Sequence, residues 1–130
     1  MPEPIVVVAA VIEQGGRFLV ARRLAGTHLA GYWEFPGGKV HDGETQDEAL
    51  RREISEELNA NISNTRKIFH TEHAYPERMV ELHFYRGELT AEPQPMLGQE
   101  LRWITREEFG ALEFPPADAE LIDGLVNAGL

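Results

Sequence analysis

The sequence has no cysteine, few basic residues and no long apolar run, and each shortage argues against a class of protein. Without cysteine there is no disulfide and no thiolate metal site, which fits a reducing cytoplasm. Only 12 Lys and Arg stand against 22 Asp and Glu, a formal net charge of −10, which disfavours binding of duplex nucleic acid through a basic surface. The apolar run 5–12 is too short to span a membrane, and it lacks the basic flank and cleavage pattern of a signal peptide.

The length of 130 residues predicts one domain, residues 1–130. Residues 5–12 are rich in valine and nearly all apolar, which is typical of a strand buried on both faces. Gln14-Gly15-Gly16 predicts a turn, and residues 17–21 are expected to return as the second strand of a hairpin with residues 5–12. A polar connection over residues 25–32 follows, and a tight turn is expected at 36–38.

The clearest helix begins at Thr45, where Thr45 and Glu48 have the spacing of a capping box. It is expected to end at Asn59, because asparagine often takes the left-handed conformation that closes a helix. The helix carries two faces: an apolar stripe of Leu50, Ile54 and Leu58, and beside it a cluster of Glu53, Glu56 and Glu57.

Further strands are expected at 65–74 and 78–89, joined across 75–77, and a short one at 101–104. Residues 91–99 should form a loop, residues 105–109 a helical turn with a second capping box, and residues 118–126 a closing helix. Strands interrupted by one helix and followed by another predict an α/β fold, a sandwich with a mixed β-sheet between helices.

Three carboxylates at i, i+3 and i+4 converge on one point of a helix, where they repel each other unless cations neutralise them. Oxygen ligands favour Mg²⁺ or Mn²⁺ over Zn²⁺. For an isolated acidic helix, a solvated face is the commoner explanation. The histidines at 41, 70, 73 and 83 have no metal-ligand spacing.

The surrounding residues favour the metal site. Gly38, Glu44, Arg52, Glu53, Ile54, Glu56 and Glu57 follow the order G-x5-E-x7-R-E-U-x-E-E, where U is a bulky aliphatic residue. This pattern resembles that of the Nudix hydrolases, with Asn59 and Ala60 where the family has glycine and an aliphatic residue. The segments ARRLAGTHLAGYWEFPGGK and EFPPAD are similar to those of the MutT-like branch, so the resemblance covers nearly the whole chain.

The resemblance implies a Nudix-type α/β/α sandwich that hydrolyses a nucleoside triphosphate to the monophosphate and pyrophosphate with two or three Mg²⁺ ions, Mn²⁺ being able to substitute. Glu53, Glu56 and Glu57 would bind the metal, and Glu53 would also orient or deprotonate the water. A carbonyl of Gly37 or Gly38 would be another ligand. Glu44 would be a helper base or a ligand through water. Arg52 would be a partner that holds a glutamate rather than a catalyst.

The family often supplies one more acidic ligand from the loop before the tryptophan at 103. Here Leu97 occupies that slot, with Gln99 nearby, and Glu100 is the candidate for the ligand.

For substrate binding, the resemblance places Arg23, His28 and Lys39 near the phosphates, and all three can donate to phosphate oxygens. Arg23 and His28 are as readily explained as surface residues of a loop. Phe35 would contact the sugar or base, or belong to the core.

Asp118 has two interpretations that are compatible. As an ionised acceptor it would select a base edge with N–H donors, such as guanine or the amino group of cytosine. As a helix cap it would begin the last helix. MutT-like enzymes that clear oxidised guanine nucleotides typically have asparagine at this slot, and cytidine-nucleotide pyrophosphatases are among the relatives with aspartate.

The expected substrate is therefore a nucleoside triphosphate, with an oxidised dGTP such as 8-oxo-dGTP favoured. CTP or a modified dCTP is the next hypothesis. The triphosphorylated 5′ end of RNA is a third, disfavoured by the acidic charge. A module that senses nucleotides without turnover is a fourth, disfavoured by the intact glutamates. A cytoplasmic protein is expected, and no pattern indicates an oligomeric state.

Overall fold

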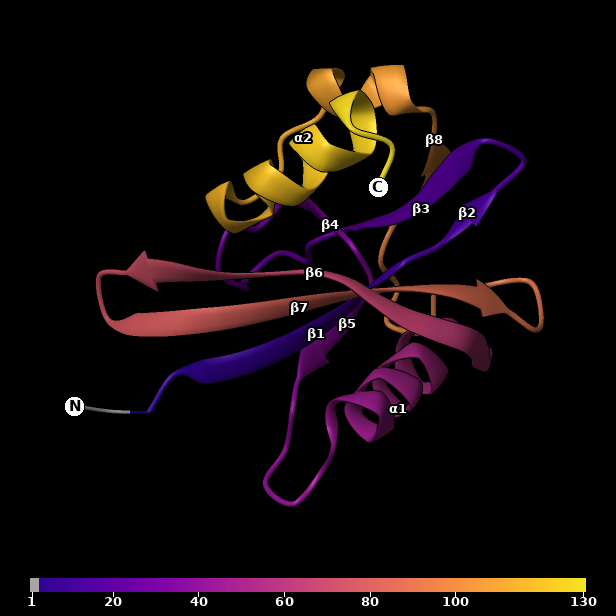
Figure 1. Ribbon diagram of the computed structural model, residues 1–130. Coiled ribbons are helices and arrows are strands. Elements are labelled where there is room, and N and C mark those ends of the chain that lie inside the picture. Colours follow the sequence, from indigo (N-terminus) through magenta and orange to yellow (C-terminus); the bar gives the residue numbers. More distant parts are fainter. Residues whose placement is uncertain (1–2) are drawn as a thin grey trace.

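The computed structural model describes residues 3–130, and it places the helices on the two sides of a central sheet (Figure 1). In chain order the strands are β1 (Ile5–Val11), β2 (Glu13–Gln14), β3 (Arg17–Arg22), β4 (Trp33–Glu34), β5 (Gly37–Lys39), β6 (Ile62–Tyr75), β7 (Arg78–Leu89) and β8 (Leu101–Ile104). The helices are α1 (Gln46–Leu58), the short 3₁₀ helices η1 (Arg106–Ala111) and η2 (Pro116–Asp118), and α2 (Ala119–Asn127).

The strands form two sheets. The first has the order β5-β1-β7-β6 and is mixed, because β1 runs parallel to β7 while the other two pairings are antiparallel. The second is antiparallel, with the order β2-β3-β4 and with β8 paired to β3. The mixed sheet and the α/β class agree with the expectation from the sequence, and the second sheet is an addition to it.

The expected hairpin between residues 5–12 and 17–21 is wrong in its pairing. β1 pairs with β7, where Val7 lies opposite Leu82, and with β5, where Val8 lies opposite Gly38. The hairpin turn itself forms, but it joins β3 to the two-residue strand β2. The reason is the composition of β1: a strand that is apolar on both faces belongs in the middle of a sheet, and the chain leaves that sheet beyond β1 to start the second one.

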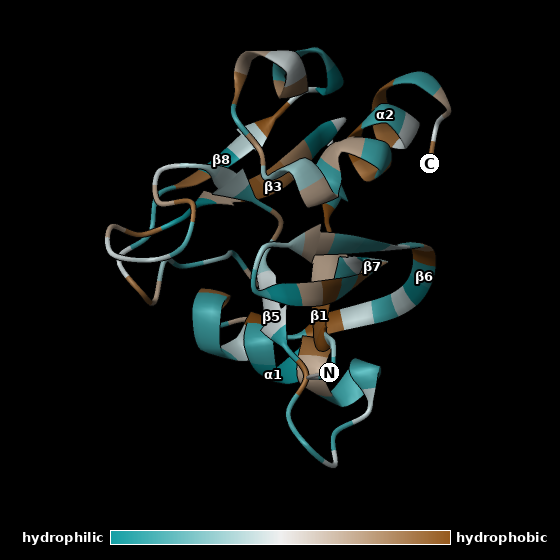
Figure 2. Cartoon of the chain, turned by 90° about the vertical axis from the view of Figure 1, so that its left-hand side faces the viewer, coloured by the Kyte–Doolittle hydropathy of each residue, from teal (hydrophilic) through white to brown (hydrophobic). Residues whose placement is uncertain are grey.

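The core lies on both faces of β1. Val8 and Ala10 face α1 and pack with its apolar stripe, whereas Ala9 and Val11 face the other side, toward Phe84 and the α2 layer. Figure 2 shows the apolar residues on the inner strands and the hydrophilic ones on the outer side of α1. Burial on both faces therefore fixes α1 against the sheet.

The boundaries of α1 confirm the capping predictions. The N–H of Glu48 donates to the Thr45 hydroxyl at 3.1 Å, and the N–H of Thr45 donates to the Glu48 carboxylate at 2.8 Å. Asn59 ends the helix with φ of 52°. The expected stripe of Leu50, Ile54 and Leu58 is fully buried.

The later elements follow the prediction with shifted ends. The strand expected at 65–74 begins at Ile62, because a bulge with Asn64 at φ of 52° lets the pairing with β7 continue. The loop at 91–99 and the strand at 101–104 are confirmed, and the helical turn extends over η1. In place of a simple turn at 36–38, a bend at Pro36 leads into β5. Among residues 3–130, none of the helices has the length and apolarity needed to span a membrane.

Candidate active site

A cavity of about 760 Å³ opens between the C-terminal half of α1, β5, the start of β7 and η2. Ten of the residues that the sequence predicted for the site line this cavity, namely Arg23, His28, Phe35, Gly37, Gly38, Lys39, Glu53, Glu56, Glu57 and Asp118. Glu44, Arg52 and Glu100 lie outside its lining. The acidic helix and Asp118, which are 60 residues apart or more in the sequence, thus share one cavity.

The two glycines of β5 allow close packing at the acidic end. A Cβ atom on Gly38 would lie 2.5 Å from the carboxyl carbon of Glu53, and one on Gly37 would lie 2.0 Å from the main-chain oxygen of Val8. Neither contact is tolerable, so only glycine lets β5 pair with β1 while the Glu53 carboxylate rests on the strand.

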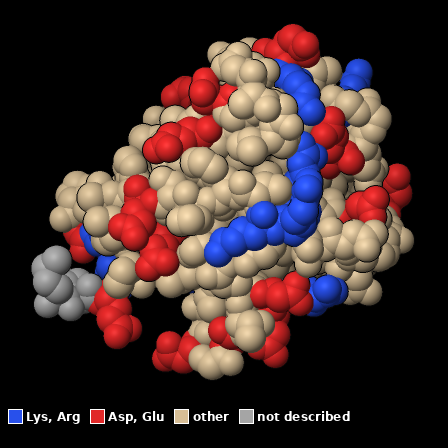
Figure 3. All heavy atoms as spheres, in the orientation of Figure 1, with Lys and Arg blue, Asp and Glu red and all other residues tan. Residues whose placement is uncertain are grey.

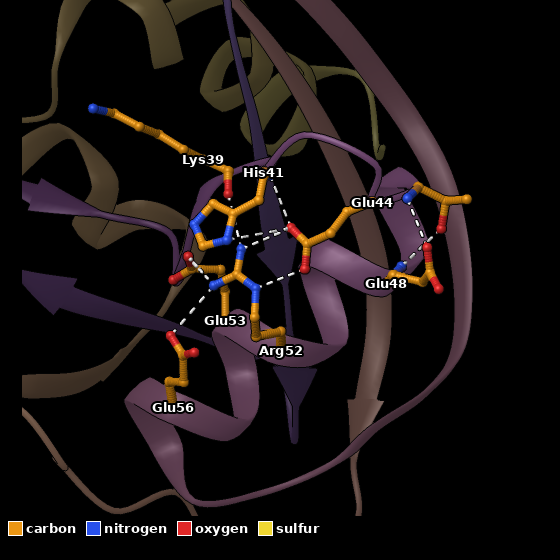
Figure 4. A network of polar contacts seen from close by, with 8 residues as sticks. Lys39, His41, Glu44, Glu48, Arg52, Glu53 and Glu56 are labelled. Carbon is orange, nitrogen blue, oxygen red and sulfur yellow. Dashed lines mark hydrogen bonds and ion pairs between the residues drawn. The ribbon is translucent and has the colours of Figure 1, made fainter.

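Arg52 lies at the centre of a network of carboxylates (Figure 4). Its Nε and Nη2 donate to the two oxygens of Glu44 at 2.7 and 3.0 Å. Its Nη1 donates to Glu53 at 2.8 Å and to Glu56 at 3.3 Å, and Nη2 also donates to the main-chain oxygen of Lys39 at 3.0 Å. One guanidinium therefore holds three glutamates and the end of β5 in a fixed relation.

Glu44 is ionised over the whole neutral range. Hydrogen bonds from Arg52, and then from the main-chain N–H of His41, lower the pKa of Glu44 to about 2. A carboxylate with so low a pKa is a weak base, which favours a role in holding Arg52 over the role of helper base.

Glu57 is the most deeply buried of the acidic residues on α1, with 7 % of its surface exposed. Burial, followed by the neighbouring Glu53 and Glu34 carboxylates, raises the pKa of Glu57 to about 9. Within residues 3–130, its Oε2 atom has no hydrogen-bond partner. A buried oxygen without a partner, next to a second carboxylate, suits an oxygen-liganded divalent cation.

The third carboxylate of the acidic cluster, that of Glu56, is bound to Arg52. The Glu56 side chain is 57 % exposed and bonds to Arg52. As the side chains stand, no three His, Cys, Asp or Glu residues in the described part of the chain are grouped as a metal centre. Binding through all three glutamates therefore requires the Glu56 carboxylate, which lines the cavity, to move from Arg52 toward Glu53 and Glu57.

At the other end of the cavity, Asp118 is 4 % exposed. Burial, followed by the charge of Glu34, raises the pKa of Asp118 to about 7, against the opposing effect of Arg23. Its side chain makes no capping hydrogen bond to α2. Asp118 does stand at the N-cap position of α2, as the capping interpretation expects, but the expected capping hydrogen bond is absent. The Asp118 side chain lines the cavity instead.

Arg23 is engaged with the protein itself. Its Nη1 donates to Glu34 at 2.6 Å, and its Nε donates to the main-chain oxygen of His28. The His28 ring in turn packs edge-on against Tyr75, with 5.1 Å between ring centroids. These contacts tie the connection between β3 and β4 to the tip of the β6–β7 hairpin beside the cavity.

Glu34 and Tyr75 line the cavity and were missed by sequence reasoning. Glu34 had a usable signal, since it is an acidic residue between the aromatic side chains of Trp33 and Phe35, both of which are buried. Tyr75 had none, because it lies at the end of a half-exposed strand.

Phe35 and Lys39 differ in their surroundings. Phe35 is 4 % exposed and packs against Phe84 and Phe109, with 6.0 and 5.9 Å between ring centroids, so it belongs to the core as well as to the cavity wall. The Lys39 side chain extends away from the Arg52 network (Figure 4).

The structure does not bring Glu100 to the acidic end. Its carboxylate lies 3.5 Å from Arg22, with half of the side chain exposed, whereas Leu97 and Gln99 line the cavity. Successive residues of β8 and the segment before it point in opposite directions, so placing Gln99 inward turns Glu100 outward.

Comparison with known proteins identifies the family of this chain. The model of the NUDIX domain family matches residues 7–124, so the chain belongs to that family and is a Nudix hydrolase.

Among individual relatives, an 8-oxo-dGTP diphosphatase of Haemophilus influenzae is 38 % identical, with 98 % of this chain and 96 % of the relative covered. A CTP pyrophosphohydrolase of Escherichia coli is 37 % identical, with coverage of 92 % and 90 %. The solution structure of the Escherichia coli ORF135 protein superposes with a TM-score of 0.84 at 35 % identity, covering 95 % of this chain and 89 % of that one.

Proposed function

We propose that this protein hydrolyses a nucleoside triphosphate to the monophosphate and pyrophosphate, with an oxidised guanine nucleotide of the 8-oxo-dGTP type as the preferred substrate. The observation that carries the proposal is the single cavity that joins Glu53 and Glu57 at one end to Asp118 at the other. Such a cavity can hold a triphosphate at the acidic end while a base reaches the buried carboxyl. The 8-oxo-dGTP diphosphatase of Haemophilus influenzae, at 38 % identity, supports the choice of base.

The residues at the acidic end would bind Mg²⁺, or Mn²⁺ in its place, through Glu53, Glu56, Glu57 and a carbonyl of the Gly37-Gly38 pair. When bound, the metal neutralises charge on the phosphates and makes water more acidic. Glu53 orients the attacking water and accepts its proton, and the hydrogen bond from Arg52 holds Glu53 in place. Lys39, which lines the same cavity, donates to a phosphate oxygen.

The contacts of Arg23 and His28 favour a structural role for both residues over the expected role of binding phosphate. Arg23 bonds to Glu34 and to the main-chain oxygen of His28, and the His28 ring packs on Tyr75, so we assign both residues to holding the wall of the cavity.

A second candidate substrate is CTP or a modified dCTP. It is favoured by the carboxyl group of Asp118, which can accept a hydrogen bond from the cytosine amino group, and by the CTP pyrophosphohydrolase of Escherichia coli at 37 % identity.

The test is an assay of pyrophosphate release from ordinary and damaged nucleoside triphosphates, with and without Mg²⁺. We expect release that requires the metal, and a loss of about 10²- to 10⁴-fold in Glu53→Gln, the range that a general base contributes. The matched control is Glu120→Gln, an exposed residue of α2. Near-normal turnover by folded Glu53→Gln would refute the assigned roles.

The same assay separates the remaining hypotheses. If no free nucleotide is hydrolysed, an RNA with a 5′ triphosphate is tested next, and binding without turnover would indicate a sensing module. On the face drawn in Figure 3 one strip of Lys and Arg side chains is bordered by acidic residues, and the other basic side chains on this face lie apart from it. Two of the arginines of this protein, Arg86 and Arg106, are bound to Glu13, which disfavours a long RNA contact through them.

We further propose that residues 1–130 act as one domain and that the protein works in the cytoplasm. The family match over residues 7–124 supports the first point, and the absence of cysteine supports the second.

A further inference from the structure

Gln99 is a buried amide beside the acidic end of the cavity, with 6 % of its surface exposed. Its Nε2 donates to the main-chain oxygen of Glu57 at 3.0 Å, and its Oε1 accepts from the N–H of Leu97 at 2.9 Å. A buried amide that uses both its donor and its acceptor holds a specific geometry, because any shift of the groups it joins leaves a polar atom unpaired.

The group held by Gln99 is the last turn of α1. The final carbonyls of a helix have no partner within the helix, and α1 carries no basic residue in its last turn. Instead, the segment 94–99 supplies the donors: the N–H of Met96 donates to the Glu57 oxygen at 3.1 Å, and the N–H of Gln94 donates to the Leu58 oxygen at 2.9 Å. Gln99 differs from these two because its donor comes from the side chain.

The Glu57 side chain is held in part by the neighbouring Glu53 carboxyl group and by the main-chain N–H of Gly37. Its Oε2 atom lacks a hydrogen-bond partner in the described chain, and the carboxylate is buried beside Glu53. These partners meet the Glu57 carboxyl group in one place only, so its position in the cavity also depends on the position of the Glu57 main chain, which Gln99 contacts directly. A displacement of a few tenths of an ångström there moves a buried carboxylate by a similar amount.

We infer that Gln99 is a positioning residue for Glu57, which fixes the last turn of α1 so that the Glu57 carboxylate stands beside Glu53 in the cavity. The inference rests on the proposed function, since it assigns Glu57 to the metal. The loop before β8 would then contribute to the site through the Gln99 amide. No acidic residue of that loop lines the cavity, where Leu97 stands instead.

The experiment compares Gln99→Leu, Gln99→Met and Gln94→Leu in the whole protein. Gln99→Met keeps the length and volume of the side chain, so it reports on the hydrogen bonds even if the leucine variant unfolds. Gln94→Leu is the matched control, because the exposed Gln94 contacts α1 through its main chain only. Binding of Mn²⁺ alone, without nucleotide, is measured from the electron paramagnetic resonance signal of the free ion, together with thermal unfolding and steady-state kinetics.

We expect the Gln99 variants to bind Mn²⁺ about 10-fold more weakly, which is the effect usual for residues that orient metal ligands. We expect kcat to fall with the metal affinity and KM for the nucleotide to change little. An unchanged Mn²⁺ affinity in a variant that only melts earlier would overturn the inference, as would an equal effect of Gln94→Leu. If Glu57→Gln binds Mn²⁺ as tightly as the wild type, the proposed metal site itself is wrong, whatever Gln99 does.

Discussion

Replacing Asp118 by asparagine should stabilise the protein, and more so at high pH. The folded-state pKa of Asp118 is raised to about 7 from the ordinary value of 3.8, mainly by burial. The folded protein therefore binds a proton that the unfolded chain has released, and stability falls as the pH rises from about 4 to about 7. Asparagine cannot ionise and is free of this loss.

The size of the effect follows from the two pKa values. A shift of about 3 pKa units corresponds to about 4 kcal/mol in total, of which about 2.5 kcal/mol falls between pH 5 and pH 8. For a chain of this length the difference in Tm between Asp118→Asn and the wild type should widen by about 5–10 °C over that interval. Thermal and urea unfolding without metal or nucleotide at pH 5, 6, 7 and 8 measure it.

The control is Asp42→Asn, since Asp42 is exposed in the loop before α1. Its difference from the wild type should not vary with pH in the same way. If the difference in Tm between Asp118→Asn and the wild type is the same at pH 5 and pH 8, or becomes smaller as the pH rises, then Asp118 does not carry a buried proton in the folded protein.

Two further predictions concern α1 and the strand beside it. Gly38→Ala places a Cβ atom 2.5 Å from the Glu53 carboxyl carbon, and displacing that carboxylate should lower pyrophosphate release about 10²-fold. The control is Gly110→Ala, because a Cβ atom there meets nothing within 4 Å. Normal turnover by Gly38→Ala would contradict the predicted clash with Glu53. Thr45→Ala removes the acceptor for the Glu48 N–H and should lower the free energy of unfolding, measured in urea, by about 1 kcal/mol. The control is Ser55→Ala, on the exposed side of the same helix, which should not destabilise the protein. Equal effects of the two substitutions would show that the Thr45 hydroxyl does not stabilise the helix as a cap.

The features that were predictable from the sequence are those that depend on residues close together in the chain. The cap at Thr45, the left-handed Asn59 and the stripe that includes Ile54 depend on spacings within one helix, and all three are confirmed. The glycines of β5 belong to the same stretch, but the contact of Gly38 with Glu53 and that of Gly37 with Val8 follow from the packing of β5 and not from a local pattern.

The features that were not predictable depend on pairing across the chain. Ile5 of β1 lies beside Val80 of β7, and no local pattern distinguishes that partner from the nearby strand β3. The loop before β8 is another case: the sequence suggested Glu100, but the inward position belongs to Gln99, because the direction of each side chain depends on the register of a strand that follows.

The two ends of the cavity are connected by charge as well as by shape. Glu34 forms a half-buried ion pair with Arg23 at 2.6 Å, and its charge raises the pKa of both Asp118 and Glu57. A cation at the acidic end would offset the charge near Glu57, whereas at the base end Arg23 offsets Glu34. The base end therefore favours a neutral Asp118, which both donates and accepts a hydrogen bond, over an ionised one, which only accepts. The choice of base thus depends on Glu34 and Arg23 as much as on Asp118. The motif from Gly38 to Glu57 contains none of these three residues, and the segment 21–39 contains Arg23 and Glu34.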